Sequence, residues 1–440
     1  MSHIDGKVAL VTVSEYGEFY HMVECSKLLV KEFNLHPVFI FTKGYGKIEH
    51  HSSILENERW SWIELGGAIG SIFTEHDSHS SDDYIYNKVK EIYNRRIIGK
   101  VAPNIVKIYF NTKKLIDLLD VRLVFSGQDY VLSVTNIVAS IASEENIKTV
   151  VVPFNMPGTY KEIIASLSKN KKHLISNTKY KTYRKFIKNS WFASYRGRVY
   201  IRLPFYKVLV SSFFKLTPKY PWVPNSGLST LLLPSKASLE YYLNSGFSKS
   251  LLKVTGPLWS DRLISQLGTL EKRKRNLKKE FDTGPERELI IISWPPNQYP
   301  RRAEEFESYD IFCDYFIMAL KNLKNRNYNI LISLHPTSEK ALIKKLNKAK
   351  LNITSKSLLE IIDCADIFMS VVSSTSFWSI QSNVPTINYD CYLYNYREFR
   401  EAGAIDIQSI SQLESAVDNI SQNRLEVIKN MQKLSTGHVY

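Results

Sequence analysis

The sequence contains few of the features that mark secreted or membrane-spanning proteins. Its 440 residues include four cysteines with no C-x-x-C spacing: Cys25, Cys313, Cys364 and Cys391. This pattern argues against a disulfide framework or a thiolate metal site and is typical of a reducing cytoplasm. No run reaches the ~18 apolar residues that cross a bilayer, and the first residues resemble a buried strand rather than a signal peptide. We therefore expect a cytoplasmic protein that is soluble or peripheral to a membrane.

The chain also lacks the common fingerprints of nucleotide-binding and hydrolytic sites. It has no Gly-x-Ser-x-Gly, Walker or Rossmann dinucleotide motif. Two groups of residues suggest a metal site: His50 with His51, and His76 with Asp77 and His79. Both groups lie in polar, serine-rich surroundings away from any strand end, which favours solvated loops. We expect no catalytic metal and no resident cofactor.

Length and composition predict two globular domains. Domains usually have ~100–200 residues, and 44% apolar with 23% charged residues is an ordinary globular composition. Strand-like and helix-like patterns alternate along both halves, as in doubly wound parallel sheets. The charged stretch 271–280 (EKRKRNLKKE) is interpreted as a surface connection at the boundary. We therefore expect two Rossmann-like α/β domains, 1–270 and 271–440.

The hydrophobic patterns place the individual elements. In the first domain we expect strands at 7–13, 36–42, 60–65, 122–126, 148–153, 229–233 and 251–255, and helices at 18–33, 82–120, 131–145 and 236–244. In the second domain we expect strands at 289–293, 329–334, 367–372 and 385–389, and helices at 303–323, 338–349, 357–364, 374–382 and 411–434.

Nearly all of the net charge of +15 lies in one segment, 163–225, which interrupts the first domain. This basic aromatic segment has 14 Lys and Arg, no Asp or Glu, and 13 aromatic residues. Cations interleaved with aromatic rings fit an element lying on an anionic membrane surface. Single-stranded RNA is bound by the same residue types, but no nucleic-acid module surrounds the segment, so we expect a membrane partner and no nucleic acid. A surface insertion whose aromatic rings pack on the first domain is the alternative.

The strongest chemical pattern lies in the second half. The strand at 329–334 leads into His335 and Pro336, and the strand at 367–372 leads into a hydroxyl-rich turn made of Ser373, Ser374 and Thr375. Ligands of open α/β sheets bind at the carboxyl ends of strands. Hydroxyls and free N–H groups at a helix start bind phosphate, and a histidine at a neighbouring strand end can bind the same phosphate. Taken singly, the alternative is that Ser374 or Thr375 is a helix cap and His335 a turn residue.

These residues carry a resemblance to a known fold family. The run LIIISWPPN … NILISLHPTSE … LLEIIDCADIFMSVVSSTSFWSIQSNVPTIN resembles the donor domain of GT-B glycosyltransferases. It is most similar to the branch with His-Pro and Ser-Ser/Thr motifs, which includes bacterial sialyltransferases, polysialyltransferases and capsule Kdo transferases. Glycerophosphate polymerases and UDP-sugar 2-epimerases have related patterns. TLLLPSKASLEYYLNSGF … LLKVTGPLWSDRL resembles the end of their N-terminal domain, so the resemblance covers roughly 230–389.

The resemblance implies a GT-B fold, with two Rossmann-like domains facing a cleft, and a metal-independent enzyme. It implies that His335, next to Pro336, contacts the nucleotide or its phosphate, and that Ser293 lines the donor pocket. It also implies that the phosphate is held by Ser373, Ser374 and Thr375. Helix dipoles and basic side chains would then offset the charge of the leaving group.

An inverting transfer also needs a base for the acceptor hydroxyl. We expect this base at a strand end of the first domain. Glu15 and Glu18 follow the first strand, with His21 one helical turn later, and Asp129 follows the strand at 122–126. The alternatives are that Glu18 favours a helix dipole and that Asp129 is a turn residue. Glu15 and Asp129 stay equal candidates.

The expected function is transfer of a sugar from a nucleotide-sugar donor to a surface glycan or lipid-linked acceptor, such as capsule or lipopolysaccharide. A CMP-linked donor, carrying a sialic acid- or Kdo-like sugar, is favoured. The expected location is the inner face of the cell membrane. Three alternatives stay open: a UDP-sugar 2-epimerase, a CDP-glycerol glycerophosphotransferase, and a non-catalytic protein bound at a membrane surface.

Overall fold

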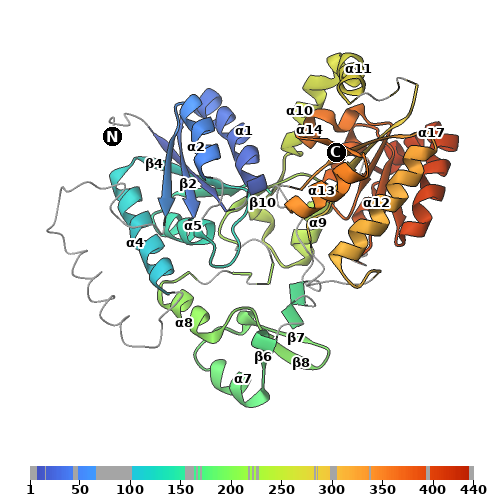
Figure 1. Ribbon diagram of the computed structural model, residues 1–440. Coiled ribbons are helices and arrows are strands. Elements are labelled where there is room, and N and C mark those ends of the chain that lie inside the picture. The colour runs from blue at the N-terminus through green and yellow to red at the C-terminus, as the bar shows by residue number, and fades with distance from the viewer. Residues whose placement is uncertain are drawn as a thin grey trace. The chain divides into compact units, whose positions relative to one another are not determined.

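The computed structural model contains two compact units, drawn in Figure 1. The first comprises Met1–Leu233 and Leu239–Lys253, and the second Pro234–Ser238 and Val254–Tyr440. The structure describes residues 7–14, 16–42, 48–65, 102–153, 163–164, 167–168, 171–216, 219–220, 222–223, 227–281, 284, 286–297, 305–335, 338–392 and 397–435. Of the predicted site residues, Glu15 and Pro336 lie outside these ranges, as do His76, Asp77 and His79.

The first unit is built on a seven-stranded sheet of order β10-β9-β5-β4-β1-β2-β3. Its strands are β1 (Val8–Val13), β2 (His36–Thr42), β3 (Ser61–Leu65), β4 (Val121–Ser126), β5 (Lys148–Val151), β9 (Thr230–Leu233) and β10 (Leu252–Val254). From β9 to β3 every pair is parallel. Its helices are α1 (Tyr16–Phe33), α2 (Ile48–Asn57), α4 (Ala102–Leu118), α5 (Val134–Glu144) and α9 (Lys236–Asn244). Every residue of β1 is buried, as expected of a central parallel strand.

The second unit, coloured from yellow to red in Figure 1, holds a six-stranded sheet of order β13-β12-β11-β14-β15-β16. Its strands, all parallel, are β11 (Leu289–Ser293), β12 (Asn329–Ser333), β13 (Asn352–Thr354), β14 (Ile367–Ser370), β15 (Thr386–Tyr389) and β16 (Ile405–Ile407). Its helices are α10 (Leu258–Gln266), α11 (Leu270–Glu280), α12 (Tyr309–Asn325), α13 (Lys340–Lys348), α14 (Leu358–Ile361), α15 (Thr375–Gln381), α16 (Arg397–Glu401) and α17 (Leu413–Ser435).

Helices cover both faces of this second sheet. Ile290 and Ile292 of β11 belong to the hydrophobic cluster that includes Phe312 of α12. Leu289 and Ile291, which alternate with them, belong to a second cluster with residues of α10 and α11. A strand buried on both faces is a continuous apolar run, as the sequence LIII shows. This arrangement confirms the predicted fold class of two Rossmann-like parallel sheets.

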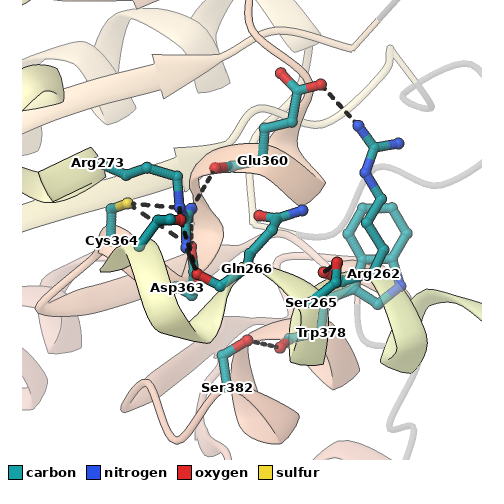
Figure 2. Close-up of polar contacts among 10 residues, drawn as sticks. Arg262, Ser265, Gln266, Arg273, Glu360, Asp363, Cys364, Trp378 and Ser382 are labelled. Atoms are coloured by element: carbon teal, nitrogen blue, oxygen red, sulfur yellow. Dashed lines mark hydrogen bonds and ion pairs between the residues drawn. The ribbon is translucent and has the colours of Figure 1, made fainter. Parts of the chain in front are cut away.

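The charged stretch 271–280, which we interpreted as a surface connection at the boundary, is a helix of the second unit, and most of its residues are exposed. It forms α11, which is anchored on the second unit at Asp363 (Figure 2). Arg273 donates from Nη1 to Asp363 Oδ1 at 2.8 Å and also contacts Oδ2 through Nη2. The same guanidinium donates to the Glu360 carbonyl and to the Gln266 carbonyl of α10. Of the charges in this stretch, Arg273 and Lys274 provide the anchoring, because Lys274 pairs with Asp366. Glu271, Lys272, Arg275 and Lys279 are exposed.

The basic aromatic segment forms a small substructure with its own core. Three short antiparallel strands, β6 (Leu174–Ile175), β8 (Arg198–Ile201) and β7 (Phe192–Tyr195), combine with α7 (Asn177–Tyr183) and α8 (Phe205–Phe213). Trp191 is fully buried among Ile175, Ile187 and Val208. Many of the aromatic rings therefore pack inside the segment itself, whereas the insertion alternative expected them to pack on the first domain. The described part of the chain has no helix long and apolar enough to cross a bilayer.

The histidine pair at 50–51 is not in a solvated loop, which corrects our interpretation. Both residues lie in α2, and His51 is fully buried. Its imidazole stacks on the Phe19 ring of α1, with centroids 3.7 Å apart and planes at 6°. The polar neighbours suggested a loop, but aromatic stacking stabilises the ring in the core.

Candidate functional site

The predicted donor site lies at the carboxyl edge of the second sheet. Ser293, the last residue of β11, is in register with Ser333 of β12 on one side and with Ser370 of β14 on the other. His335 follows Ser333 by two residues, and the hydroxyl-rich turn begins at Ser373. The two predicted binding groups therefore belong to the same edge of one sheet.

The strands that carry these groups are not neighbours, which corrects our expectation. β11 lies between β12 and β14, so the His335 and Ser373 positions are separated by two strand spacings, roughly 10 Å. Ser293 lies on the central strand. The sequence order of the strands suggested adjacency, but β11 enters the sheet between them. A ligand that contacts both groups therefore needs more than one polar group.

The backbone turns sharply after β14. Val372 has φ of 47°, in the left-handed region that a β-branched residue rarely occupies. Its N–H donates to Oδ1 of Asn388 at 3.2 Å, and Asn388 Nδ2 donates to Oδ1 of Asp406 at 3.0 Å. Such backbone strain costs of order 1–3 kcal/mol and persists only where surrounding contacts fix it. Asn388 and Asp406 supply that fixation from the next two strands.

The turn leaves hydrogen-bond donors available. Ser373 Oγ accepts from Thr375 Oγ1 at 2.9 Å and from the Thr375 N–H at 3.3 Å. Ser374 stands at the cap of α15 but makes no side-chain cap bond, so the simple cap interpretation is not realised for this residue. Within the described ranges, the N–H groups of Ser373 and Ser374 and the Ser374 hydroxyl have no acceptor. Successive free N–H groups beside a left-handed residue form a concavity suited to anions.

α15 itself contributes little to this site. It has seven residues, and a short helix has only a small dipole because few peptide units add to it. The hydroxyls and N–H groups of the turn are therefore the main binding groups. A buried hydrogen bond of 2.6 Å between Ser370 Oγ and Ser376 Oγ joins the end of β14 to α15.

His335 lies at the surface, and its carbonyl accepts a hydrogen bond from the Ser338 N–H at 2.9 Å. Desolvation by the surrounding protein lowers the pKa of its imidazole from the ordinary value of 6.5. The ring is therefore mainly neutral at pH 7, with one donor and one acceptor nitrogen. It is suited to a directional hydrogen bond rather than to a fixed positive charge.

Trp294 and Pro295, directly after β11, are held by hydrogen bonds, a feature that the sequence patterns did not predict. The Trp294 N–H extends the sheet by donating to the Ser333 carbonyl at 2.9 Å. Trp294 Nε1 donates to Tyr309 Oη at 3.1 Å, and that hydroxyl donates to the Pro295 carbonyl at 2.8 Å. Ser293 is thus followed directly by two residues whose positions are held by hydrogen bonds. The SWPP run offered a hint, because a tryptophan directly after a buried strand usually packs.

A second set of polar residues lies at the carboxyl edge of the first sheet. Glu18 is fully buried, and its carboxylate accepts from the Ser14 N–H after β1 (2.7 Å) and from the Gly127 N–H after β4 (2.8 Å). Glu18 therefore joins two strand ends rather than merely favouring a helix dipole. Asp129 is also fully buried, and its Oδ2 accepts from Ser229 Oγ at 3.2 Å.

Gln128, beside Asp129, was not predicted as a site residue. It is 4% exposed, and neither atom of its side-chain amide has a hydrogen-bond partner in the described part of the chain. Buried amides are normally paired, so this side chain is a candidate for contact with a polar ligand. The sequence alone gave no indication, because SGQDY looks like an ordinary turn. Among the described residues, no three His, Cys, Asp or Glu side chains gather as a metal site requires.

Comparison with known proteins supports the fold. No protein-family model and no curated protein matches the chain. Among solved structures, S. aureus MnaA in complex with UDP matches with a TM-score of 0.56 and 11% identity, over 99% of this chain and 93% of that one. UDP-GlcNAc 2-epimerase from Neisseria meningitidis, bound to UDP-GlcNAc, matches at 0.53 and 13%, over 98% and 96%.

The wall teichoic acid polymerase TagF, as its H548A variant, matches at 0.52 and 10%, over 98% of this chain and 84% of that one. A glycosyltransferase from Rickettsia africae matches at 0.51 and 13%, over 99% and 93%. At such low identity these likenesses show the fold alone. The chain has the GT-B architecture of two Rossmann-like α/β units, which glycosyltransferases and nucleotide-sugar epimerases share.

Proposed function

We propose that this protein is a metal-independent glycosyltransferase whose second unit binds a nucleotide-sugar donor. The observation that carries the proposal is the turn at Val372–Thr375. It combines a strained backbone with two N–H groups and a hydroxyl that have no acceptor among the residues that the structure describes. An anionic phosphate fits these donors. Ser293 and His335 lie along the same sheet edge, where they can contact other polar groups of the donor.

In this mechanism an acceptor hydroxyl attacks the anomeric carbon, and the bond from that carbon to the phosphate oxygen breaks. The turn holds the departing phosphate through N–H and O–H donors, which stabilise the negative charge as it develops. Neutral His335 donates a hydrogen bond to the same leaving group or to the nucleotide. A carboxylate of the first unit, Asp129 or Glu15, removes the proton of the acceptor hydroxyl.

For the donor we favour a CMP-linked sugar of the sialic acid or Kdo type, on the resemblance of the His-Pro and Ser-Ser/Thr motifs. The acceptor would be a surface glycan or a lipid-linked glycan such as capsule or lipopolysaccharide. The 14 cations of the basic aromatic segment support placement against anionic lipid at the inner face of the cell membrane. A lipid-linked acceptor would be presented there.

A second candidate is a UDP-sugar 2-epimerase. Two matched structures contain UDP or UDP-GlcNAc, and a diphosphate suits a site whose two ends lie on strands separated by β11. An epimerase would convert its nucleotide sugar without any acceptor. The two candidates share a donor site and differ in what the first unit does.

The test is a thermal-shift screen with CMP-, UDP-, GDP- and CDP-linked donors, followed by product analysis with the donor that binds. A ligand at a hundred times its Kd stabilises the native state by about 2.7 kcal/mol, so binding raises Tm. Transfer needs an acceptor, whereas epimerisation proceeds with donor alone. If no donor raises Tm, the donor site is wrong.

Two variants test whether the donor binds at the turn. Ser374→Pro removes one free N–H and one hydroxyl at the turn, whereas Ser415→Ala changes an exposed serine on α17. We expect the first to abolish the donor-induced shift and the second to preserve it. Equal shifts in both variants would place the donor elsewhere.

A further inference from the structure

One corner of the basic aromatic segment combines exposed apolar side chains with cations. The corner is defined here as the turn 184–188 after α7 together with the first turns of α8. The Tyr183 ring at the end of α7 stacks on the Phe205 ring at the start of α8, with centroids 3.8 Å apart and planes at 14°. This stack holds the turn beside α8, in the green part of Figure 1.

The corner turns some apolar side chains inward and leaves others in solvent. Ile187 and Val208 are 6% and 0% exposed, in the cluster around Trp191. Phe186 is 67% exposed, and Tyr206 and Leu209 of α8 are 41% and 40% exposed. α8 therefore has apolar residues on both its buried and its exposed faces. A helix of this kind on a protein surface usually meets a second apolar environment.

The same turn carries exposed cations around Phe186. Arg184, Lys185 and Lys188 are all exposed, and the whole segment 163–225 has no acidic residue to neutralise them. Among the described residues, none of the three forms an ion pair with an acid elsewhere in the chain. The cations are therefore available to an anionic partner.

We propose that this corner docks the protein on a bilayer containing anionic lipid, with Phe186, Tyr206 and Leu209 in the headgroup region and Arg184, Lys185 and Lys188 on lipid phosphates. The proposal rests on the proposed function for its purpose, since it brings the enzyme to a lipid-linked acceptor. Lipid binding itself requires no donor and no turnover. Interfacial elements combine these residue types because apolar groups insert while cations meet the charged surface.

The observations favour lipid over single-stranded RNA. RNA binding of this kind needs several exposed rings on which bases stack. Trp191, Tyr200 and Trp222 of the segment are buried and Tyr183 is stacked on Phe205, which leaves Phe186 and Tyr206 as the exposed rings of the corner. Leu209 is aliphatic and offers no stacking surface. A bilayer instead gains from both aliphatic and aromatic insertion.

The test is sedimentation of the full-length protein with vesicles of phosphatidylcholine alone, and with vesicles of equal parts phosphatidylcholine and phosphatidylglycerol. We expect binding to the mixed vesicles only, weakening as salt rises because screening shortens the reach of the charges. Removing two cations with the double change Arg184→Gln and Lys185→Gln should weaken binding roughly thirtyfold. The matched control, Lys344→Gln with Lys348→Gln on the exposed side of α13, should leave binding unchanged.

A second pair of variants tests the contribution of the exposed apolar side chains of the corner. Phe186→Ser should weaken vesicle binding roughly tenfold, whereas Leu425→Ser, at a residue 77% exposed on α17 of the second unit, should not. Absence of vesicle binding, or equal losses in the test and control variants, overturns the proposal. So does binding to a single-stranded RNA oligonucleotide that is tighter than binding to mixed vesicles. Donor-induced thermal shifts should persist in every corner variant, so failure of lipid docking is distinct from failure of the donor site.

Discussion

The Val372 backbone N–H donates a 3.2 Å hydrogen bond to Oδ1 of Asn388, so a side chain on β15 holds the strained turn after β14. Asn388 is in turn oriented by Asp406 on β16. The geometry of the proposed phosphate site therefore depends on two residues that do not touch the phosphate in our proposal. Such positioning contacts often matter as much as the binding groups themselves.

We predict that Asn388→Ala weakens donor binding strongly, although it lowers the free energy of unfolding only moderately. Loss of the two hydrogen bonds that the Asn388 side chain makes should lower the free energy of unfolding by about 2–4 kcal/mol, and the freed turn should reduce the donor-induced thermal shift strongly. Urea unfolding and thermal shift measure the two effects separately. Asn347→Ala, at an exposed residue of α13, is the control. An unchanged donor-induced shift in the Asn388 variant would contradict the positioning role.

We predict that His335 acts as a neutral hydrogen-bonding group. His335→Ala should abolish transfer with an unchanged Tm, because the residue is at the surface. His335→Gln should retain part of the activity, since an amide can also donate a hydrogen bond. Because the pKa of the imidazole is lowered below 6.5, the ring stays neutral as pH rises above 7, and kcat/KM should not fall there on its account. A loss of activity as pH rises through values below 6.5, absent in the Gln variant, would show that the cation is required.

The sequence predicted the long buried strands of both sheets, but not the short edge strands or the contacts of α11. Runs such as LIII at 289–292 and VALVTV at 8–13 predicted buried strands, because parallel strands are apolar on both faces. The two three-residue edge strands of the second sheet, β13 and β16, were missed, since periodicity is hard to see in so short a run. The anchoring of α11 was missed, because two of its charges, Arg273 and Lys274, pair with residues 90 and 92 positions away.

The candidate site was predictable in its residue types but not in its arrangement. Hydroxyls after one strand and a histidine after another identified the carboxyl edge of the second sheet. The order of strands, which puts β11 between them, follows from the crossover connections and not from local patterns. The Asn388 contact was also invisible, although an asparagine within the apolar run VPTINY is a warning of a buried polar contact.

Gln128 supplies a prediction about the acceptor. Its unpaired, buried amide destabilises the free protein by about 1–3 kcal/mol, and we expect hydroxyls of the acceptor to pair with it. Gln128→Leu should therefore raise the free energy of unfolding by about 1 kcal/mol while raising the KM for acceptor, with the KM for donor unchanged. Steady-state kinetics with each substrate varied in turn provide the measurement. An unaltered acceptor KM would remove Gln128 from the acceptor site.

Gly403 supplies a prediction about packing in the second unit. It has φ of 99°, and a Cβ there would lie 2.6 Å from the Met431 Cα in α17. Gly403→Ala should destabilise the unit by about 3 kcal/mol or more, because the clash is with backbone and cannot be relieved by a rotamer change. Gly256→Ala is the matched control, since Gly256 has φ of 85° with no atom within 4 Å of the added Cβ. It should cost about 1 kcal/mol. Urea unfolding measures both variants. Similar decreases in their free energies of unfolding would show that α17 can move away from the added Cβ at little cost.

The contribution of Asp366 to the stability of the second unit depends on pH. Burial alone would raise the pKa of its carboxyl, but hydrogen bonds from Lys274 (2.6 Å) and the Leu289 N–H (2.8 Å), with the charges of Lys274 and Arg424, lower the pKa below its ordinary value of 3.8. The folded protein therefore binds the proton less readily than the unfolded chain does. The resulting stabilisation is present above pH 3.8 and is lost as pH falls through the lowered pKa.

We predict that Asp366→Asn lowers the free energy of unfolding at pH 7 by about 2–3 kcal/mol, because it leaves Lys274 and Arg424 without their buried partner. The difference from the wild type should be constant above pH 5 and shrink below pH 3.8, as the native carboxylate is protonated. Asp310→Asn provides the contrast: its ion pair with Lys345 is 79% exposed on the aspartate side and should be worth less than about 1 kcal/mol. A difference for Asp366 that grows as pH falls would mean that its charge is a liability in the folded state, and that Lys274 and the Leu289 N–H do not compensate for its burial.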